Sequence, residues 1–377
     1  MGLLLAGVAA TPAHAETIRS QQWHLDAMKA DEIWKISTGK GITVAVIDTG
    51  VNQIPELDGQ VLPGTAIPAG DADTGRDNDY LGHGTTMAAI IAATGKHPSG
   101  NGAYGLAAGV KILPIRVPDI MEGAKTPSLV AAIRYAADSD AKVINISLAT
   151  AGQPEDDVDR IEAVKYAVSK GKLVFAGVGN NGSSSNRLLY PAGTPGVVGV
   201  AAVDSSGEPT SESQHGPQVD LAAPGTEIVT ACTGKTGLCT SHGTSDATAL
   251  ASASAALLWA AHPDWTNNQV LRVLLNTAGK PVDGSGRNDY VGYGVVRPRV
   301  ALQTPGDPGP ADVYPLPDLA AAAPPPTQAP TPAPGDKAAT APKSDDSTTP
   351  WTGIGLGLAA CVLLGGAVTA ALVRRNR

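Results

Sequence analysis

The chain has 377 residues, of which 42% are hydrophobic and 16% charged, and its formal net charge is −8. This length allows one large domain or two ordinary ones, and the negative charge, without a Lys/Arg stripe, argues against nucleic acid as a partner. Because there is only one phenylalanine, any core has to be built mainly from Ala, Val, Ile and Leu.

The N-terminal segment has the pattern of an export signal. Residues 3–10 form an apolar run, and Ala13 and Ala15 then supply an A-x-A cleavage site. We therefore expect a signal peptide over residues 1–15 and export of the chain after it. The basic residues that usually precede the apolar run are missing, which suggests a start codon further upstream.

The sequence of residues 16–303 predicts one α/β domain with a short N-terminal extension. After a polar lead-in, apolar strand patterns alternate with helical patterns, which predicts a mainly parallel sheet covered by helices. Asp48 comes directly after the first strand, at the end where open α/β sheets place their ligands. The expected strands span residues 41–47, 110–117, 142–148, 172–178, 197–203, 219–221 and 227–231, and the expected helices span 84–94, 128–138, 157–170, 248–261 and 266–278.

The composition changes at residue 304. Residues 304–350 are rich in Pro, Ala and Thr and predict an extended stalk. Residues 351–373 are uncharged and apolar over a length that can cross a bilayer, so we expect a transmembrane helix there. The arginines of residues 374–377 place this tail in the cytoplasm and the domain outside.

The cysteines could form a disulfide bond, and one acidic loop could form a metal site. Cys361 lies in the expected span, so Cys232 and Cys239 remain for a disulfide in an oxidising compartment, with two free thiols as the alternative. Residues 71–79 space carboxylates in a way that could bind Ca²⁺. No Glu closes that loop and Arg76 interrupts it, so a solvated acidic loop is the favoured interpretation and no cofactor is expected.

The candidate chemistry lies in three short motifs: Asp48-Thr49-Gly50-Val51, His83-Gly84-Thr85 and Gly243-Thr244-Ser245. Ser245 lies where a glycine turn leads into an alanine-rich helix, so its hydroxyl adjoins free backbone N–H groups. Taken alone, Ser245 or Thr244 would more simply be an N-cap, Asp48 a turn former and His83 a structural histidine. An acid, a base and a nucleophile at three such junctions instead predict a catalytic set.

In the order Asp48, His83, Ser245, these motifs resemble the subtilisin-like serine proteases over most of residues 21–302. Further blocks that carry the resemblance are Trp23–Met28, Val143–Leu148, Gly179–Gly182, Tyr190–Ala192, Val197–Val203 and Leu221–Gly225. The resemblance implies a three-layer α/β domain with a mainly parallel central sheet. It also implies cleavage of peptide bonds through an acyl-enzyme.

The resemblance assigns a role to each matching position. Ser245 is the expected nucleophile, His83 the general base, and Asp48 the residue that orients the histidine ring. Asn180 is the expected oxyanion donor, with a plain turn residue as the alternative. The expected substrate-binding residues are Ser147, Leu148, Ala149 and Gly179.

Four positions depart from the family pattern: Thr86, Ala149, Asp246 and Ala249, the last of which stands where the family usually has a proline. Ala149 stands where a glycine is expected, which would narrow the first specificity pocket. Asp246 stands directly after the nucleophile, where the family usually has a larger residue. The sequence alone offers no physical reason for a carboxylate at this position.

The overall order of segments resembles the mycosins, which are membrane-anchored actinobacterial proteases associated with type VII secretion. We therefore expect a membrane-anchored, extracytoplasmic serine endopeptidase that acts on proteins or peptides and associates with a secretion-system membrane complex. Two alternatives remain open. One is a structural scaffold of that complex with secondary or lost proteolytic activity, and the other is a degradative surface protease.

Overall fold

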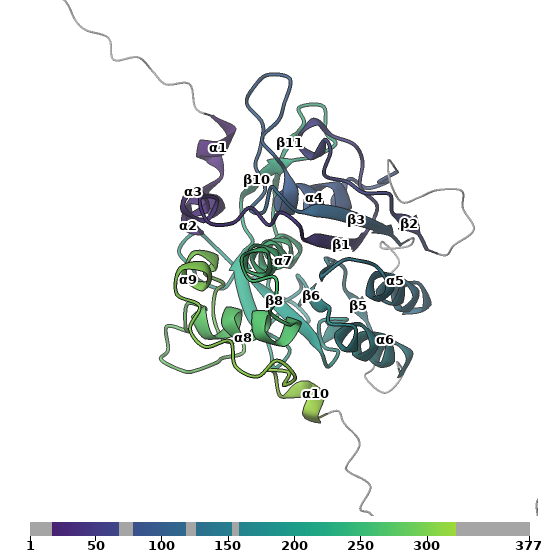
Figure 1. Ribbon diagram of the computed structural model, residues 1–377, viewed down its shortest axis with the longest axis vertical. Coiled ribbons are helices and arrows are strands. Elements are labelled where there is room, and N and C mark those ends of the chain that lie inside the picture. Colours follow the sequence, from purple (N-terminus) through teal and green to yellow (C-terminus); the bar gives the residue numbers. More distant parts are fainter. Residues whose placement is uncertain (1–16, 68–77, 118–125, 153–157, 322–377) are drawn as a thin grey trace, which may run out of the picture. The chain divides into compact units, whose positions relative to one another are not determined.

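A seven-stranded parallel sheet forms the middle layer of the protein (Figure 1). The structure is a computed structural model that describes residues 17–67, 78–117, 126–152 and 158–321. The strand order is β2-β3-β1-β4-β6-β8-β9, and all neighbours in it are parallel. The strands are β1 (Thr43–Asp48), β2 (Thr65–Ala66), β3 (Lys111–Arg116), β4 (Val143–Ile146), β6 (Leu173–Gly177), β8 (Val197–Val203) and β9 (Leu221–Pro224).

The sheet is buried on both faces, which explains why its strands are almost continuously apolar. Strand β1 shows how the alternation of side chains divides the core. Val44 and Val46 belong to the hydrophobic cluster on one face, and Ala45 and Ile47 belong to the cluster on the other.

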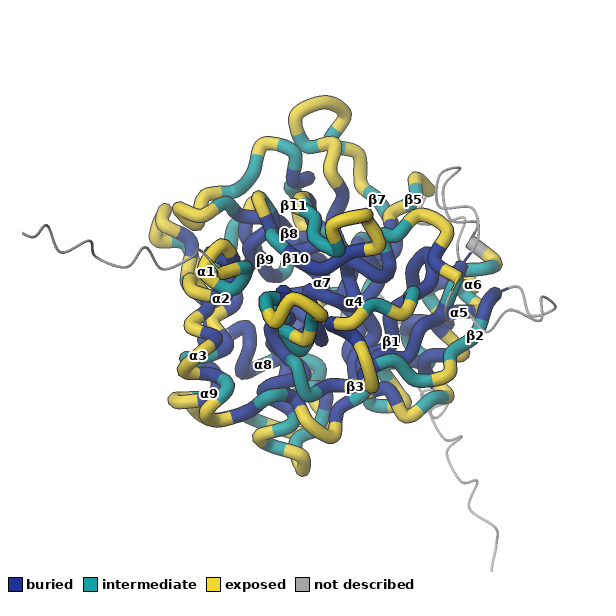
Figure 2. The backbone as a smooth tube through the Cα atoms, turned by 90° about the horizontal axis from the view of Figure 1, so that it is seen from above, coloured by how far each residue is buried: buried dark blue, intermediate teal, exposed yellow. Residues whose placement is uncertain are grey.

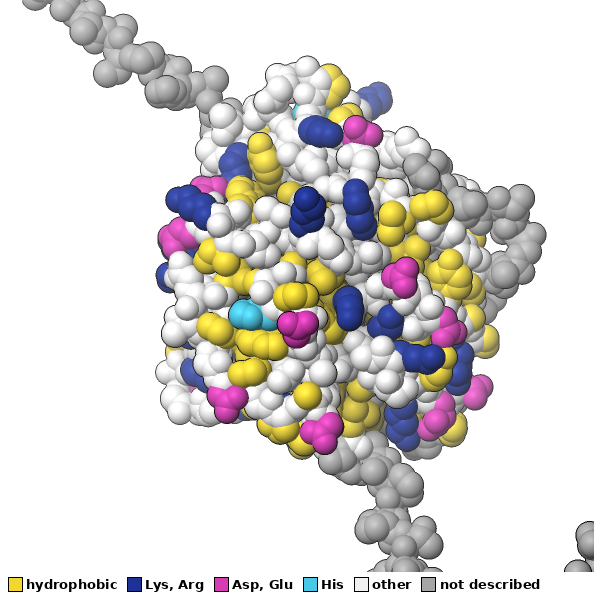
Figure 3. Space-filling model, in the orientation of Figure 1, with side chains coloured by type: hydrophobic (Ala, Val, Ile, Leu, Met, Phe, Trp, Pro, Cys, Tyr) yellow, Lys and Arg dark blue, Asp and Glu magenta, His cyan; other side chains and the backbone are white. Residues whose placement is uncertain are grey.

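Helices cover each face of the sheet (Figure 1). One face packs against α5 (Thr126–Asp138) and α6 (Val158–Ser169), and the other packs against α4 (His83–Ala92) and α7 (Thr244–Ala261). Helix α7 runs through the interior of the domain and is buried along nearly its whole length (Figure 2). On the face shown in Figure 3, basic side chains are scattered among acidic and apolar ones.

The remaining elements are short or lie around the helix α7. They are α1 (Ile18–Gln21), α2 (Trp23–Ala27), α3 (Ala30–Ile33), η1 (Pro55–Leu57), β5 (Thr150–Ala151), β7 (Leu189–Tyr190), β10 (Ile228–Ala231), β11 (Leu238–Ser241), α8 (Asn267–Thr277), α9 (Pro298–Gln303) and α10 (Asp318–Ala321). Strands β10 and β11 form an antiparallel hairpin directly before α7.

The predicted α/β class and mainly parallel sheet are confirmed, and one helix boundary needs correction. The sequence predicts that the alanine-rich helix begins at Thr248, but α7 begins at Thr244. Ser245 therefore lies inside the first turn of the helix and not before it.

The beginning of the predicted stalk packs against the domain. Arg272 of α8 donates to the carbonyl oxygen of Pro308 at 2.7 Å, and Asp318 accepts a hydrogen bond from the Gly196 N–H at 2.6 Å. Leu316 is buried as well. The packed part of the chain thus continues past the boundary predicted at residue 303, because polar groups of the domain hold an otherwise extended segment.

The remaining terminal predictions fall on residues outside the described ranges. These are the signal peptide over 1–15, the rest of the stalk, the transmembrane helix over 351–373 and the tail over 374–377. Within the described ranges, no helix combines the length and apolar character that crossing a bilayer requires.

Candidate active site

Asp48 and His83 form a hydrogen-bonded pair at the carboxyl edge of the sheet. Asp48 ends β1 and is completely buried, while His83 begins α4 and its side chain is 35% exposed. The His83 Nδ1 lies 2.7 Å from Asp48 Oδ1. Because Nδ1 faces a carboxylate, it carries the ring proton, and Nε2 is the basic nitrogen of the neutral ring.

The glycine after His83 is required by the close approach of β1. A Cβ atom at Gly84 would overlap the carbonyl oxygen of Gly50 and lie 3.0 Å from the Cβ of Asp48. The Gly84 N–H donates to the Thr49 hydroxyl at 2.9 Å. The two sequence motifs around Asp48 and His83 therefore fit together through their glycines.

Asp79 holds this arrangement together and was not predicted as a site residue. Its Oδ1 accepts from the Thr49 hydroxyl at 2.5 Å and from the Gly82 N–H at 2.8 Å. Its Oδ2 accepts from the N–H and the hydroxyl of Thr85, at 2.8 and 2.6 Å. Asp79 thus joins the segment after β1 to the first turn of α4, and so fixes His83 against Asp48.

The prediction of a solvated acidic loop over residues 71–79 is wrong for Asp79, the last residue of that loop. Asp79 is 8% exposed because several donors converge on its carboxylate, whereas residues 71–77 lie outside the described ranges. Among the described residues, no group of three or more His, Cys, Asp or Glu side chains is arranged to hold a metal ion.

Ser245 lies in the first turn of α7 and does not cap it. The N-cap residue is Gly243, with φ of 117°, which has no side chain of its own to cap the helix, so the N-cap alternative for Ser245 and Thr244 is wrong. The Ser245 hydroxyl donates to the carbonyl oxygen of Ser147 at 3.2 Å. In return, the Ser147 hydroxyl donates to the carbonyl oxygen of Ser245 at 3.1 Å.

Asn180 contacts the same helix start from the segment after β6. Its Oδ1 accepts from the N–H of Thr244 at 2.9 Å and from the Thr244 hydroxyl at 3.0 Å. A Cβ atom at Gly243 would lie 2.8 Å from Asn180 Nδ2. Since the amide oxygen is engaged, the amide nitrogen is the part of Asn180 that can donate to a ligand beside Ser245.

The expected substrate-binding residues lie just beyond two neighbouring strands at this edge. Ser147 and Leu148 come after β4 and are buried, whereas Ala149 is exposed. Gly179 comes after β6 and has φ of 109°, and a Cβ atom there would overlap the Oε1 atom of Gln214. The structure thus brings both segments to the place where Ser245 lies.

Asp246 is completely buried in the first turn of α7. Its Oδ1 accepts a hydrogen bond from the hydroxyl of Ser241, at the end of β11, at 2.8 Å. Burial raises the pKa of Asp246 to about 7, against the hydrogen bond of Ser241 and the charge of His83, which lower it. The carboxylate that the sequence left unexplained therefore ties the β10–β11 hairpin to the helix.

The carboxylates around His83 make it more basic than an ordinary histidine. Burial lowers the pKa of His83, but the charge and hydrogen bond of Asp48 and the charges of Asp246 and Asp79 together outweigh burial. Together they raise the pKa of His83 from 6.5 to about 9. The neutral ring is thus a strong base.

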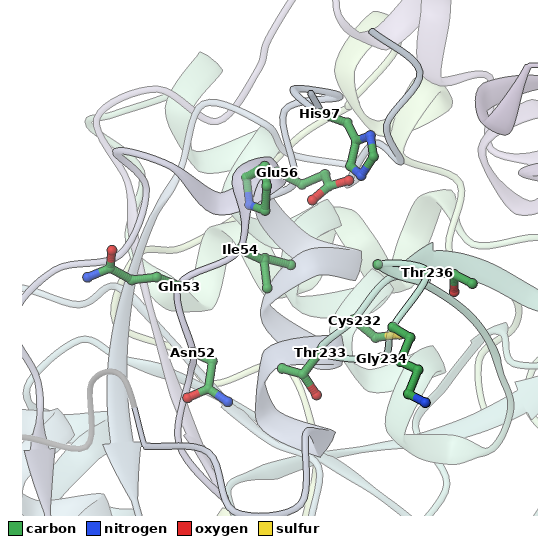
Figure 4. A pocket seen from close by; sticks show the side chains of 12 residues that line it. Asn52, Gln53, Ile54, Glu56, His97, Cys232, Thr233, Gly234 and Thr236 are labelled. Atoms are coloured by element: carbon green, nitrogen blue, oxygen red, sulfur yellow. The ribbon is translucent and has the colours of Figure 1, made fainter. Parts of the chain in front are cut away.

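The Cys232–Cys239 disulfide is present, and it closes the turn of the β10–β11 hairpin. Beside it lies a cavity of about 740 Å³, lined by this hairpin, by residues 52–56 and by His97 (Figure 4). Figure 4 shows the carboxylate of Glu56 and the ring of His97 next to each other in the wall. The residues that line the cavity do not include Asp48, His83 or Ser245.

A model of the Subtilase family matches residues 39–294 of the chain. Mycosin-1 of Mycolicibacterium smegmatis is 31% identical over 334 residues, which cover 74% of this chain and 72% of mycosin-1. M-protease of Shouchella clausii is 32% identical over 266 residues, which cover 71% of this chain and 65% of M-protease. The chain therefore spans slightly less than two thirds of the latter relative.

Solved structures show the same likeness. The crystal structure of MycP1 from Mycobacterium smegmatis superposes with a TM-score of 0.69 at 29% identity, covering 80% of this chain and 89% of that one. A chain of the periplasmic assembly from the ESX-5 inner membrane complex superposes with a TM-score of 0.67 at 28% identity. That match covers 87% of this chain and 92% of the other.

Proposed function

Because the chain belongs to the subtilase family, we propose that it is a serine endopeptidase in which Asp48, His83 and Ser245 cleave peptide bonds. The observation that carries the proposal is the 2.7 Å hydrogen bond between Asp48 and His83. It lies at the same sheet edge as a serine in the first turn of a helix, with a side-chain amide next to that turn.

The reaction begins with the transfer of the Ser245 hydroxyl proton to Nε2 of His83. For this step the hydroxyl turns away from the Ser147 carbonyl oxygen, to which it donates in the free protein. Ser245 Oγ then forms a bond to the substrate carbonyl carbon, and the electron pair of the C=O bond moves to its oxygen. Asp48 keeps the ring oriented and stabilises the imidazolium.

The second half of the reaction reuses the same groups. The imidazolium of His83 gives its proton to the leaving amine as the C–N bond breaks, which produces the acyl-enzyme. Water, deprotonated by the neutral ring, then hydrolyses the ester at Ser245. Asn180 Nδ2 and the backbone N–H of Ser245 at the helix start stabilise the oxyanion in both halves.

The substrate would bind as an extended segment beside the two chain segments that come after β4 and β6. Ser147–Ala149 and Gly179 offer backbone groups there for pairing in the manner of an added strand. The methyl group of Ala149, in place of the family's glycine, would favour a small side chain in the first pocket. We therefore expect cleavage of proteins or peptides in accessible, unstructured segments.

The activity is tested by labelling the full-length protein with a fluorophosphonate, which reacts with activated serines. We expect the wild-type protein to be labelled and the Ser245→Ala variant to remain unlabelled. A folded wild-type protein that resists labelling would rule out the proposed activity.

The oxyanion role of Asn180 predicts a loss in turnover. Asn180→Ala is expected to lower kcat by about 10²–10³-fold with a small change in KM, a range known from a subtilisin oxyanion-hole variant. The reason is that the lost N–H acts on the oxyanion and not on the bound substrate. Steady-state kinetics measure this split, and an effect confined to KM would contradict the role.

The raised pKa of His83 predicts an alkaline pH profile. Since the neutral ring is the base, activity is lost as the pH falls through the pKa of His83. That pKa is about 9 and not 6.5, so kcat/KM of the free enzyme should keep rising from pH 7 to pH 9. A profile that is already flat above pH 7.5 would show that the carboxylates around His83 do not act in this way.

We further propose that the protein is anchored in the membrane with its domain outside, and that it acts with a type VII secretion complex. The sequence pattern of residues 351–377 and the likeness to mycosin-1 and to a chain of the ESX-5 periplasmic assembly support this. Fractionation and protease accessibility of the full-length protein test the anchoring. Complementing a deletion strain with wild type or Ser245→Ala separates a proteolytic from a scaffolding role in secretion.

A further inference from the structure

One carboxylate oxygen of Asp246 is buried, and none of the contacts of this side chain explains why. The side chain is completely buried directly after Ser245, and its Oδ1 accepts from Ser241. Its Oδ2 is buried without a hydrogen-bond partner among the described residues. Leaving such an oxygen unpaired is costly. The hydrogen bond to Ser241 uses only Oδ1 of Asp246. A role in closing the turn therefore does not explain why Oδ2 is buried as well.

The charged groups that act on Asp246 come from three other parts of the fold. They are His83 at the start of α4, His242 in the turn before α7, and Glu212 in the segment between β8 and β9. Glu212 hydrogen-bonds to His242 at 2.9 Å and is therefore already paired. Both cations in this set are histidines, which are charged only when protonated. The carboxylate of Asp246 thus gains a counter-charge from α4 only when His83 takes up a proton.

His83 and Asp246 lie close enough for the charge of each to act on the other. Helix α4 packs against α7, and His83 and Ser245 each lie in the first turn of their helix. Asp48 contacts His83 from β1, and the carboxylate of Asp79 is already engaged by five hydrogen-bond donors. Asp246 is therefore the carboxylate on the side of the nucleophile.

Building on the proposed protease function, we propose that Asp246 is a positioning residue, a second carboxylate that stabilises the His83 imidazolium formed when Ser245 gives up its proton. Asp246 makes and breaks no covalent bond in this step. The proton moves from Ser245 Oγ to His83 Nε2 as the Oγ–carbon bond forms. The interaction is strong in the transition state and weak with a neutral ring, which is the condition for raising kcat.

The titration of the two groups fits this role. The pKa of Asp246 is raised to about 7 by burial, so the carboxylate is ionised above neutral pH. The pKa of His83 is raised to about 9, with burial opposing the effect of Asp48, Asp246 and Asp79. Between these values both partners carry their charges. Removing the negative charge of Asp246 must lower the pKa of His83. The acidic limb of the pH profile, where kcat/KM falls as His83 becomes protonated, should then move to lower pH.

The Asp246→Asn variant tests this, because an amide oxygen can still accept from Ser241 while the charge is lost. In the full-length protein we expect the acidic limb of kcat/KM to move down by about one pH unit. At pH 10, where the ring is neutral in both proteins, kcat/KM should fall about tenfold. Asp283→Asn is the matched control, since it makes the same change in a surface turn, and its limb should stay at the wild-type position.

Two further variants separate charge from structure. Asp246→Glu keeps the charge and should keep the limb near the wild-type pH. Ser241→Ala removes the turn hydrogen bond but leaves the carboxylate in place. Since that bond lowers the pKa of Asp246, its loss raises this pKa, and the limb should move by less than in Asp246→Asn. If Ser241→Ala moves the limb as far as Asp246→Asn does, Asp246 acts through the turn alone and the proposal is overturned.

A readout without turnover keeps this proposal distinct from the proposed function. The titration midpoint of the His83 ring can be followed by NMR in the Ser245→Ala protein, with and without Asp246→Asn. We expect the midpoint to fall by about one pH unit in the double variant. An unchanged midpoint would overturn the role of Asp246 even in an active protease. A wild-type protein that neither cleaves nor reacts with a fluorophosphonate would instead refute the protease function.

Discussion

Replacement of Ser245 with alanine is expected to lower kcat by about 10⁶-fold, the size of loss known for the nucleophile of subtilisin. The hydroxyl is the only part of the site that becomes covalently bound to substrate, so neither His83 nor Asn180 can take its place. The loss is measured with a labelled protein substrate such as casein. Stability should change little, because the Ser245 hydroxyl makes one 3.2 Å hydrogen bond in the free protein.

The double variant Ser245→Ala with His83→Ala sharpens this prediction. Since base and nucleophile act as one unit, removing both should cost about as much as removing either one. Losses that multiply would contradict a shared proton transfer between them. Residual cleavage above the uncatalysed rate would reflect the oxyanion donors and substrate binding.

Replacement of Asp79 with alanine is expected to lower the free energy of unfolding by about 3–5 kcal/mol, as for loss of one partner in a buried charged network. The change leaves the hydroxyl of Thr49, the N–H of Gly82 and the N–H of Thr85 without their acceptor. Activity should fall as well, because these groups hold the first turn of α4 against β1. Denaturant unfolding and steady-state kinetics of the same preparation measure the two effects.

Asp58→Ala is the control for this variant. Asp58 is an exposed aspartate whose ion pair with Lys96 is 3.7 Å long, and such pairs contribute about 0–1 kcal/mol. The contrast between the two aspartates is the test. Equal effects on unfolding would mean that the hydrogen bonds of Asp79 do not carry the stability assigned to them.

The buried sheet was the easiest part of the fold to predict. Strand β8 occupies the expected residues 197–203, and β1 at Thr43–Asp48 lies within two residues of the expected run. Strands that are buried on both faces are continuous apolar runs with polar or glycine residues at their ends. The position of Asp48 at the sheet edge results directly from that pattern.

The start of α7 was harder to predict because local and distant contacts conflict there. Thr244, Ser245 and Asp246 are polar, and a polar run before an alanine-rich stretch is typical of a cap. The tertiary structure is what extends the helix over them. Asn180 accepts a hydrogen bond from the Thr244 N–H, and Ser147 exchanges hydrogen bonds with Ser245. Neither partner can be assigned from the local sequence.

Asp79 and the segment after residue 303 could not be placed for a similar reason. In sequence Asp79 is the last residue of an acidic loop, and only the fold brings the Thr49 hydroxyl to it. The proline-rich composition after residue 303 predicts an extended segment, but it does not reveal that Arg272 and Gly196 bind the first part of this segment. Composition describes how a chain behaves alone, whereas these contacts depend on the surface beneath it.

The helix α7 is enclosed by the sheet and by other helices, and its alanines let the surrounding backbones approach closely. In such a dense interior an added methylene forces neighbouring groups to move. Substitutions in α7 that would shift the position of Ser245 are therefore poorly tolerated during evolution. For the proposed protease we therefore expect substrate selectivity to diverge at exposed positions such as Ala149, which can vary while the reacting atoms stay fixed.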